Sequence, residues 1–476
     1  MLTELLHEPL EASVADPAAC LERARQIREA YASLNREQVG AAQLLEFKFA
    51  SLYWRRTLLA RLHEEPPSWL DTDDNTFRAV VDALNCRLPD PVLSVLSRHL
   101  NPDTIQYLLA LQGVATDQST EYRSLAGPGV TLNIKANRNS SWPFERWKRK
   151  PEFKNYEFSG SGVDFRGVHF RPGDVLLSNV NIDGNGVYTT LSDPTRFSSH
   201  SAVFAILEDK GGRYPAVIET YEKGVRAVPL NVFLGESFCA YVEVYRHRDL
   251  DDSRASLINA AAIEMMARAR GYNFDSRSED RDYVSCCSVG RQLHLDAGLE
   301  PASGKSRIEH PAIQANLEKL EYTSFDFFAP VDYLLDSNFQ CVGWVDNHQF
   351  EELLARELVE SYFRELFMTR TLNPRRLPFM GHVNRWGIGH IRRQSALGKA
   401  ISLVEGFDHV SLPRGPDPLM AVITIIEAQL GRVVQQTVRR LKSMELPTGY
   451  FSLSEFSQRP EVRRHLEASF NPAWLE

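Results

Sequence analysis

The chain of 476 residues is too long for one small core and indicates roughly two to four domains. Its composition, 43% hydrophobic and 24% charged, is that of a folded globular protein and argues against wholesale disorder. The formal net charge of -8 argues against generic nucleic-acid binding, because a phosphate backbone requires a basic protein face.

No targeting segment is visible. The N-terminus has no basic stretch followed by an apolar one, and no run approaches the roughly 18 apolar residues of a membrane-spanning helix. The six cysteines are Cys20, Cys86, Cys239, Cys286, Cys287 and Cys341. They lack the spacing of a disulfide framework or a zinc site. We therefore expect a reduced, soluble, cytoplasmic protein without metal or cofactor, with export by a signal-less route left open.

The first part of the chain is predicted to be helical, and we assign residues 1–125 to a helical domain. Asp16 and Pro17 suit the N-cap and first turn of its first helix. Apolar residues recur at helical spacing in segments 18–34, 44–62, 76–88 and 103–115. None of these segments gathers reactive side chains, which favours a structural or partner-binding role.

The middle of the chain, residues 126–347, is predicted to be an α+β domain. Short β-branched and aromatic runs, broken by Gly, Pro, Asn and Asp, predict strands in 127–136, 156–165, 173–180, 201–207, 214–222 and 239–247. A helical pattern over 253–272 follows, and then a strand-like run that leads to the two adjacent cysteines. Strands followed by packed helices are typical of the α+β class.

The last part, residues 348–476, is predicted to be helical again. Apolar stripes run through 350–368 and 418–441; the second contains Leu419, Val422, Ile423, Ile426, Leu430 and Val433. A packed core helix is the favoured interpretation of that stripe, and a peripheral membrane contact is the alternative. The segment 368–404 between them contains basic residues and no Asp or Glu: Arg370, Arg375, Arg376, Arg385, Arg392, Arg393 and Lys399.

Three side chains of the middle domain suit cysteine-dependent catalysis. His200 stands at the start of a predicted buried strand and Glu219 near the end of the next, so adjacent strands could hold the imidazole beside the carboxylate. Cys287 opens a predicted helix, whose dipole favours a thiolate. Each residue alone is more often structural, and the spacing by itself leaves the triad a weak prediction.

Residues from about 170 to 300 resemble the permuted papain-like amidases of the NlpC/P60 superfamily, the YiiX/YaeF-like group. The resemblance rests on short motifs in a fixed order: Gly173-Asp174, Ser199-His200, Glu219 with Gly224, Val225 and Phe233, Tyr245-Arg246, Tyr272 with Phe274, and Cys287-Ser288. It implies a permuted papain-like domain with an antiparallel sheet and packed helices. The order His, Glu, Cys is the reverse of the cysteine-first order of papain, as a circular permutation requires.

One departure concerns the cysteine motif. The family usually has Tyr-Cys-Ser-Glu, whereas Cys287 is flanked by Cys286 and followed two residues later by Val289. We predict Cys287 as the nucleophile and keep Cys286 as the alternative. The resemblance implies that His200 is the base, that Glu219 orients it, and that Ser199 and Ser288 lie at the substrate site.

The implied reaction is acyl transfer through a thioester, most readily the cleavage of an amide bond in a peptide-like substrate. A phospholipid acyl hydrolase or acyltransferase on the same triad is the second hypothesis, because Arg385 and Arg392 could bind a lipid phosphate. A catalytically inactive protein-binding module is the third. The sequence determines neither the acyl donor and acceptor nor the oligomeric state.

Overall fold

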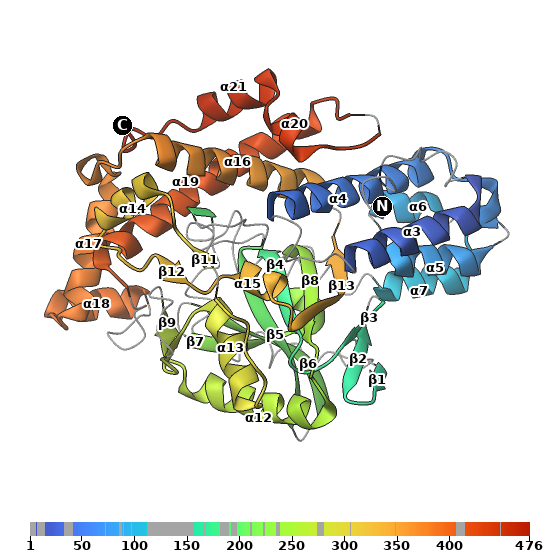
Figure 1. Ribbon diagram of the computed structural model, residues 1–476, viewed down its shortest axis with the longest axis horizontal. Helices are drawn as coiled ribbons and strands as arrows, with labels where there is room; N and C mark the ends of the chain where they lie inside the picture. Colours follow the sequence, from blue (N-terminus) through green and yellow to red (C-terminus); the bar gives the residue numbers. More distant parts are fainter. Residues whose placement is uncertain are drawn as a thin grey trace.

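The fold is described from a computed structural model that covers residues 6, 15–32, 41–111, 157–180, 190–191, 198–273 and 280–476. Within these ranges the positions 72, 85–87, 89, 97, 166, 210–211, 222–223, 235–238, 305, 348, 406–414 and 448 are outside the description. The predicted strand in 127–136 also lies outside the described residues. Figure 1 shows a central sheet with helices on its faces and a helical region at each end of the chain.

The centre of the molecule is a six-stranded antiparallel sheet with the order β13-β8-β4-β5-β6-β7. Its strands are β4 (Val175–Val180), β5 (His200–Asp209), β6 (Gly212–Tyr221), β7 (Gly224–Pro229), β8 (Cys239–His247) and β13 (Phe339–Asp346). Four of them match predicted runs. The other two, β7 and β13, were not predicted as strands. The antiparallel sheet and its packed helices confirm the predicted α+β class.

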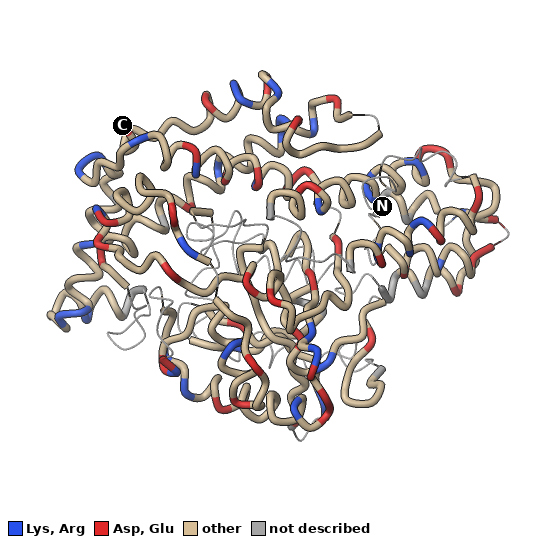
Figure 2. The backbone as a smooth tube through the Cα atoms, in the orientation of Figure 1, with Lys and Arg blue, Asp and Glu red and all other residues tan. Residues whose placement is uncertain are grey.

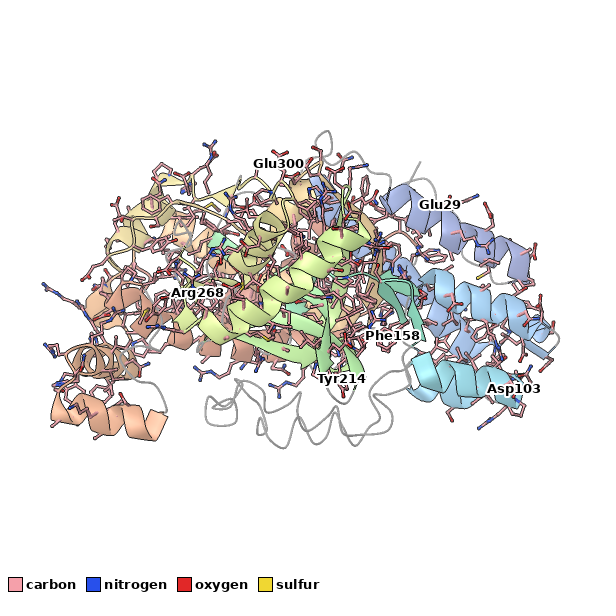
Figure 3. The ribbon with its side chains drawn as sticks, turned by 90° about the horizontal axis from the view of Figure 1, so that it is seen from below. Glu29, Asp103, Phe158, Tyr214, Arg268 and Glu300 are labelled. Carbon is pink, nitrogen blue, oxygen red and sulfur yellow. The ribbon has the colours of Figure 1, made fainter. Side chains whose placement is uncertain are left out.

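One face of the sheet is covered by α12 (Asp252–Arg268) and α13 (Cys286–Asp296). Alternate residues of β5, such as Val203 and Ala205, pack there against Ile258 of α12 and Leu293 of α13. Figure 3, seen from below, shows the helix that ends at the labelled Arg268 lying across the strands. This layer determines where the N-terminus of α13 lies relative to the sheet.

The opposite face of β5 belongs to a second apolar cluster. Phe204 packs with Phe233, which follows β7 in the short helix α11 (Leu230–Phe233), and with Phe170 of the small sheet β1-β2-β3. That sheet comprises β1 (Glu157–Ser159), β2 (Gly162–Phe165) and β3 (Val168–Phe170). Side chains at the start of β5 on this face are therefore held between the sheet and aromatic rings.

Two motif segments that are far apart in the sequence meet beside β3. Arg246 of β8 donates from Nε and Nη2 to the two carboxylate oxygens of Asp174, each at 2.7 Å. Gly173 has φ +99°, a conformation that favours glycine, and its carbonyl accepts from His294 Nε2 at 2.9 Å. The Gly-Asp and Tyr-Arg motifs thus contact each other, and together they connect β4, β8 and α13.

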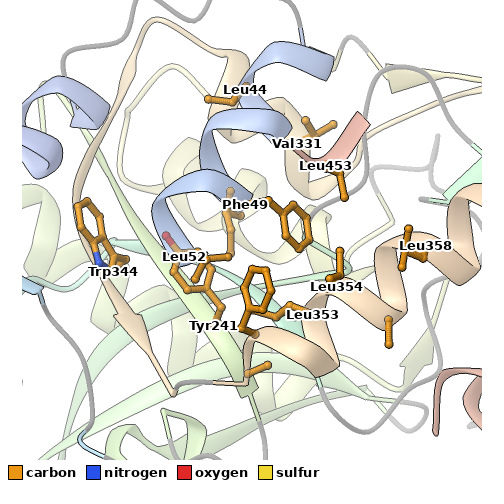
Figure 4. Packing of buried hydrophobic residues seen from close by; sticks show 14 of the residues in the cluster. Leu44, Phe49, Leu52, Tyr241, Val331, Trp344, Leu353, Leu354, Leu358 and Leu453 are labelled. Atoms are coloured by element: carbon orange, nitrogen blue, oxygen red, sulfur yellow. The ribbon is translucent and has the colours of Figure 1, made fainter. Parts of the chain in front are cut away.

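The N-terminal helical region packs on the central sheet mainly through its two longest helices. The helices of this region are α3 (Pro17–Ala32), α4 (Ala41–Glu64), α5 (Asp74–Leu84), α6 (Asp90–Leu96) and α7 (Pro102–Leu111), with a 3-10 turn at Ser68–Asp71. Lys48 Nζ lies 2.7 Å from Glu243 Oε2 of β8, and Tyr31 of α3 donates to the same carboxylate. Arg55 Nε lies 3.0 Å from Asp346 Oδ2 of β13. Figure 4 shows α4 side chains packed among those of β8 and α16.

The C-terminal helices complete this core. They are α16 (Phe350–Thr369), α17 (Phe379–Arg392), α18 (Ala396–Glu405), α19 (Asp417–Lys442), α20 (Leu453–Ser457) and α21 (Pro460–Ser469), with a 3-10 turn at Pro374–Arg376. The predicted apolar stripe of α19 is buried, and α19 packs against α16, α17 and α21. It is a core helix.

Short elements lie on both sides of α13 in the sequence. The pair β9 (Gly271–Tyr272) and β10 (Tyr283–Val284) precedes it. Between α13 and β13 lie β11 (Ser306–Arg307) paired with β12 (Asp326–Phe327), and the helices α14 (Pro311–Glu318) and α15 (Pro330–Leu335). The β9-β10 pair leads the chain directly into α13. The domain boundaries at 125 and 347 stay predictions.

Candidate active site

The structure brings His200 and Glu219 together at one end of the sheet. His200 opens β5, opposite Ser178 of β4, and Glu219 lies in the neighbouring strand β6. His200 Nε2 is 3.0 Å from Glu219 Oε2, and both side chains are buried. The Phe233 ring packs beside the imidazole with ring centroids 6.3 Å apart. Because Nε2 contacts the carboxylate, Nδ1 is the ring nitrogen that faces away from Glu219.

Arg226 occupies the other oxygen of the same carboxylate, and the sequence analysis did not find it. It stands opposite Glu219 across the β6-β7 pair, with Nε 2.7 Å and Nη2 2.6 Å from Oε1. Burial raises the pKa of Glu219, but the charge of Arg226 and the His200 hydrogen bond together hold it below its usual value. The pairing follows from the β6-β7 hairpin, in which residues 219 and 226 are equidistant from the turn.

The helix that carries the cysteines begins one residue earlier than expected. Ser285 is the N-cap of α13: its Oγ accepts from the Ser288 N–H at 3.3 Å, while Ser288 Oγ accepts from the Ser285 N–H at 2.8 Å. This reciprocal pair is a capping box. Cys286 is therefore the first helical residue and Cys287 the second. Ser288, predicted at the substrate site, takes part in this cap.

This helix start bears on the choice between the two thiols, which stays a prediction. Cys286 raises the pKa of His200, and His200 in turn lowers the pKa of Cys286. Burial opposes a charged imidazole, but Cys286 and then Glu219 raise the pKa of His200 to about 9. The Cys287 thiol and then His200 lower the pKa of Cys286 well below its usual value, despite burial. Such a pair favours a thiolate beside an imidazolium.

Cys287 is held in a different environment. Its Sγ lies 3.6 Å from Cys286 Sγ, and its carbonyl accepts a hydrogen bond from Tyr333 Oη at 3.0 Å. Burial and the neighbouring Cys286 raise the pKa of the Cys287 thiol well above its usual value. Cys287 stays the nucleophile predicted from the sequence, with Cys286 as its alternative. With Cys286 in the family's cysteine position, Ser288 stands where the family has an acidic residue.

Tyr272 completes the surroundings of the thiol. Its hydroxyl donates to Cys286 Sγ at 3.8 Å from β9, the strand that pairs with β10 just before the helix. Burial, with the nearby thiols, raises the pKa of Tyr272 well above its usual value, so it remains a proton donor. Tyr272 belongs to the motifs of the resemblance, which assign it no role.

Of the remaining predicted substrate contacts, Ser199 lies next to His200, whereas Arg385 and Arg392 do not lie with the cysteines. Ser199 is buried beside His200, and its N–H donates to the Ser178 carbonyl at 3.1 Å. Arg385 and Arg392 lie on α17, well away from α13 in Figure 1. Arg385 Nη2 is 3.2 Å from Glu321 Oε1, and Arg392 Nε is 2.6 Å from Asp417 Oδ1. These arginines are therefore paired with carboxylates outside the cysteine site.

Two negative findings apply to the part of the chain that the structure describes. It contains no group of three or more His, Cys, Asp or Glu side chains arranged to hold a metal ion. None of its helices combines the length and the apolar character needed to cross a bilayer.

Comparison with known proteins agrees with the expected resemblance. Residues 169–289 match the family model described as "Permuted papain-like amidase enzyme, YaeF/YiiX, C92 family", and this segment contains His200, Glu219 and Cys286. One similar solved structure is that of metalloprotein yiiX from Escherichia coli O157:H7, DUF1105, with 17% identity over 37% of this chain and 97% of that chain, and a TM-score of 0.29. No curated protein matches the chain. The family match supports a papain-like cysteine amidase or hydrolase in general terms.

Proposed function

From the permuted papain-like segment 169–289, we propose that this protein is a cysteine amidase with Cys286 as its nucleophile. The observation that carries the proposal is the buried contact of 3.0 Å between His200 Nε2 and Glu219 Oε2, together with the mutual shift of the pKa values of the His200 imidazole and the Cys286 thiol. A thiol, a base and an orienting carboxylate in this order are the parts that nucleophilic catalysis requires.

In the proposed reaction, Cys286 Sγ attacks the carbonyl carbon of an amide, and a C–S bond forms. The imidazolium of His200 donates its proton to the leaving amine as the C–N bond breaks. His200 then takes a proton from water, which attacks the thioester and releases the carboxylic acid and the thiol. Glu219 keeps Nε2 protonated, so that Nδ1 is the nitrogen that exchanges the proton with the sulfur and the amine.

Two donors are available for the oxyanion that develops on the carbonyl. The first N–H groups of α13 have no partners within the helix and lie next to the thiol, where the helix dipole also favours negative charge. Tyr272 Oη, already directed at the sulfur, can donate to an oxygen bound beside it. Both groups are fixed before substrate binds, as electrostatic catalysis requires.

An amide substrate is favoured over a phospholipid substrate. The lipid hypothesis depended on Arg385 and Arg392 lying at the thiol site, and their ion pairs with Glu321 and Asp417 remove that support. An inactive binding module has no need for a thiol whose pKa is lowered by a second thiol and by an imidazole.

The test exposes the enzyme to peptide and muropeptide mixtures and, separately, to lipid extracts, and identifies products by mass spectrometry. Cys286→Ala should abolish product formation, and Cys287→Ala, as the matched control, should retain it. New amines and carboxylic acids from the peptide mixtures support the proposal. Lysolipids alone, or full activity of Cys286→Ala, would overturn it.

A further inference from the structure

The helical pair α17 and α18 carries exposed apolar side chains that the fold does not use. Among the described residues, the large exposed hydrophobics are Leu257, Ile263, Leu295, Phe379, Trp386 and Leu397. Three of them belong to α17 and α18, and Phe379 is the most exposed at 78%. Exposed aromatic side chains that cluster on one short segment are a feature of interaction surfaces.

The packing of α17 explains why one side of it is free. Ile391 of α17 and Met420 of α19 form a small buried cluster, joined by Ile388 and Ile401. Phe379 and Trp386 are seven residues apart, two helical turns, and so share a face of α17. That face also carries Arg393, seven residues beyond Trp386, at the C-cap. Helix α17 therefore has one apolar face that packs against its neighbours and a second face with exposed aromatic side chains.

The charge on this segment is positive throughout. Residues 368–404 contain no Asp or Glu. Arg375, Arg393 and Lys399 are exposed, and none of them contacts an acidic side chain among the described residues. Figure 2 marks the Lys and Arg positions along the backbone at this end of the molecule in blue.

A hollow of about 400 Å³ lies beside the aromatic face. It is lined by Glu321, His382, Arg385, Trp386, Gly389, Arg393, Asp417 and Pro418. Its two carboxylates are already paired, Glu321 with Arg385 and Asp417 with Arg392. Arg393 is therefore the cation of this hollow that has no acidic partner, and an anionic group is the ligand that it would attract.

We propose that α17 and α18 form a docking surface for an anionic lipid bilayer. Phe379, Trp386 and Leu397 would enter the boundary between headgroups and acyl chains, where aromatic residues are favoured. Arg375, Arg393 and Lys399 would meet the lipid phosphates. The net charge of the whole chain is -8, so an anionic membrane repels the rest of the molecule and selects this end. The surface lies on helices outside the cysteine site, and the inference does not depend on the proposed reaction.

The test measures co-flotation of the full chain with vesicles of phosphatidylcholine alone and of phosphatidylcholine mixed with phosphatidylglycerol. The unmodified protein should bind the anionic vesicles at least tenfold more tightly, and added salt should weaken this binding. The double variant Phe379→Ser/Trp386→Ser and the double variant Arg393→Gln/Lys399→Gln should each reduce binding about tenfold or more. All four side chains are exposed, so the thermal midpoint should not change.

The matched control is Leu257→Ser/Ile263→Ser, which removes two exposed apolar side chains from α12. This variant should bind vesicles like the unmodified protein. Equal loss in the control, equal binding to neutral and anionic vesicles, or no binding to either would overturn the proposal. A dimer in sedimentation experiments that Phe379→Ser/Trp386→Ser dissociates would also overturn it, because the face would then belong to a second copy of the chain.

Discussion

Arg226 and Glu219 stand directly opposite each other on β7 and β6, and the arginine holds the carboxylate oxygen that His200 leaves open. A buried carboxylate without this partner would tend to take up a proton and so lose its charge. The charge that supports the His200 imidazolium is therefore maintained by a residue that does not touch the thiol.

Replacement of Arg226 should separate its positioning role from its contribution to folding. Arg226→Met should destabilise the protein by roughly 3–5 kcal/mol, because it leaves a buried charge without its partner. It should also lower kcat/KM and move the alkaline limb of the pH profile toward lower pH. In Arg226→Lys, the alkaline limb should return part of the way to its position in the unmodified protein. A fall in thermal stability with an unchanged pH profile would show that Arg226 is only structural.

The pH dependence of kcat/KM should follow the coupled thiol and imidazole. The acid limb should lie well below the ordinary cysteine pKa, and the alkaline limb near pH 9, where His200 loses its proton. Because the pKa of His200 is raised in the folded state, its stabilisation is complete below 6.5 and is lost as the pH rises through about 9. An alkaline limb near 6.5 would contradict the ion pair.

Glu219→Gln should lower kcat by about a hundredfold, less than the complete loss expected for Cys286→Ala, because it weakens proton transfer but leaves the nucleophile. The alkaline limb should move toward lower pH as His200 loses the carboxylate. The double variant Glu219→Gln/Arg226→Met removes both buried charges and serves as the stability control. If Glu219→Gln and Cys286→Ala abolish activity equally while both remain folded, Glu219 has a more direct role.

The two adjacent thiols should differ in reactivity. Iodoacetamide near neutral pH should label Cys286 at least about tenfold faster than Cys287, because alkylation proceeds through the thiolate. Peptide mapping of the alkylated protein gives both rates in one experiment. In the His200→Ala variant, the difference between the alkylation rates of the two cysteines should be smaller. Faster labelling of Cys287 would restore the original assignment.

The N-cap residue Ser285 should affect both the stability of the protein and the reactivity of Cys286. Ser285→Ala removes the N-cap acceptor of α13 and should lower stability by about 1 kcal/mol. It should also slow the alkylation of Cys286, since the thiol stands on the first helical residue. The matched control is Ser452→Ala, which removes the comparable N-cap of α20. That variant should lose similar stability and leave the alkylation rate unchanged.

Much of the site could be predicted because its parts occur in a fixed order on local motifs. His200 and Glu219 lie on β-branched and aromatic runs that are bounded by turn residues and predict strands. Arg226 was missed because β7 was not predicted as a strand, so nothing placed residue 226 opposite Glu219. The sequence left two candidates for the nucleophile because both cysteines fit a helix start. The spacing of Ser285 and Ser288 carried the information that would have decided it.

The contact between α4 and the sheet determines which truncated forms of the protein can fold. Glu243 lies fully buried in β8, and the amine that neutralises it belongs to Lys48 of α4, 195 residues earlier in the sequence. A fragment that began at the first strand would expose the apolar faces of β8 and leave this carboxylate in a dry environment without a counter-ion. The minimal stable unit of this enzyme core therefore includes the N-terminal helices, and expression trials of shorter fragments should yield insoluble protein.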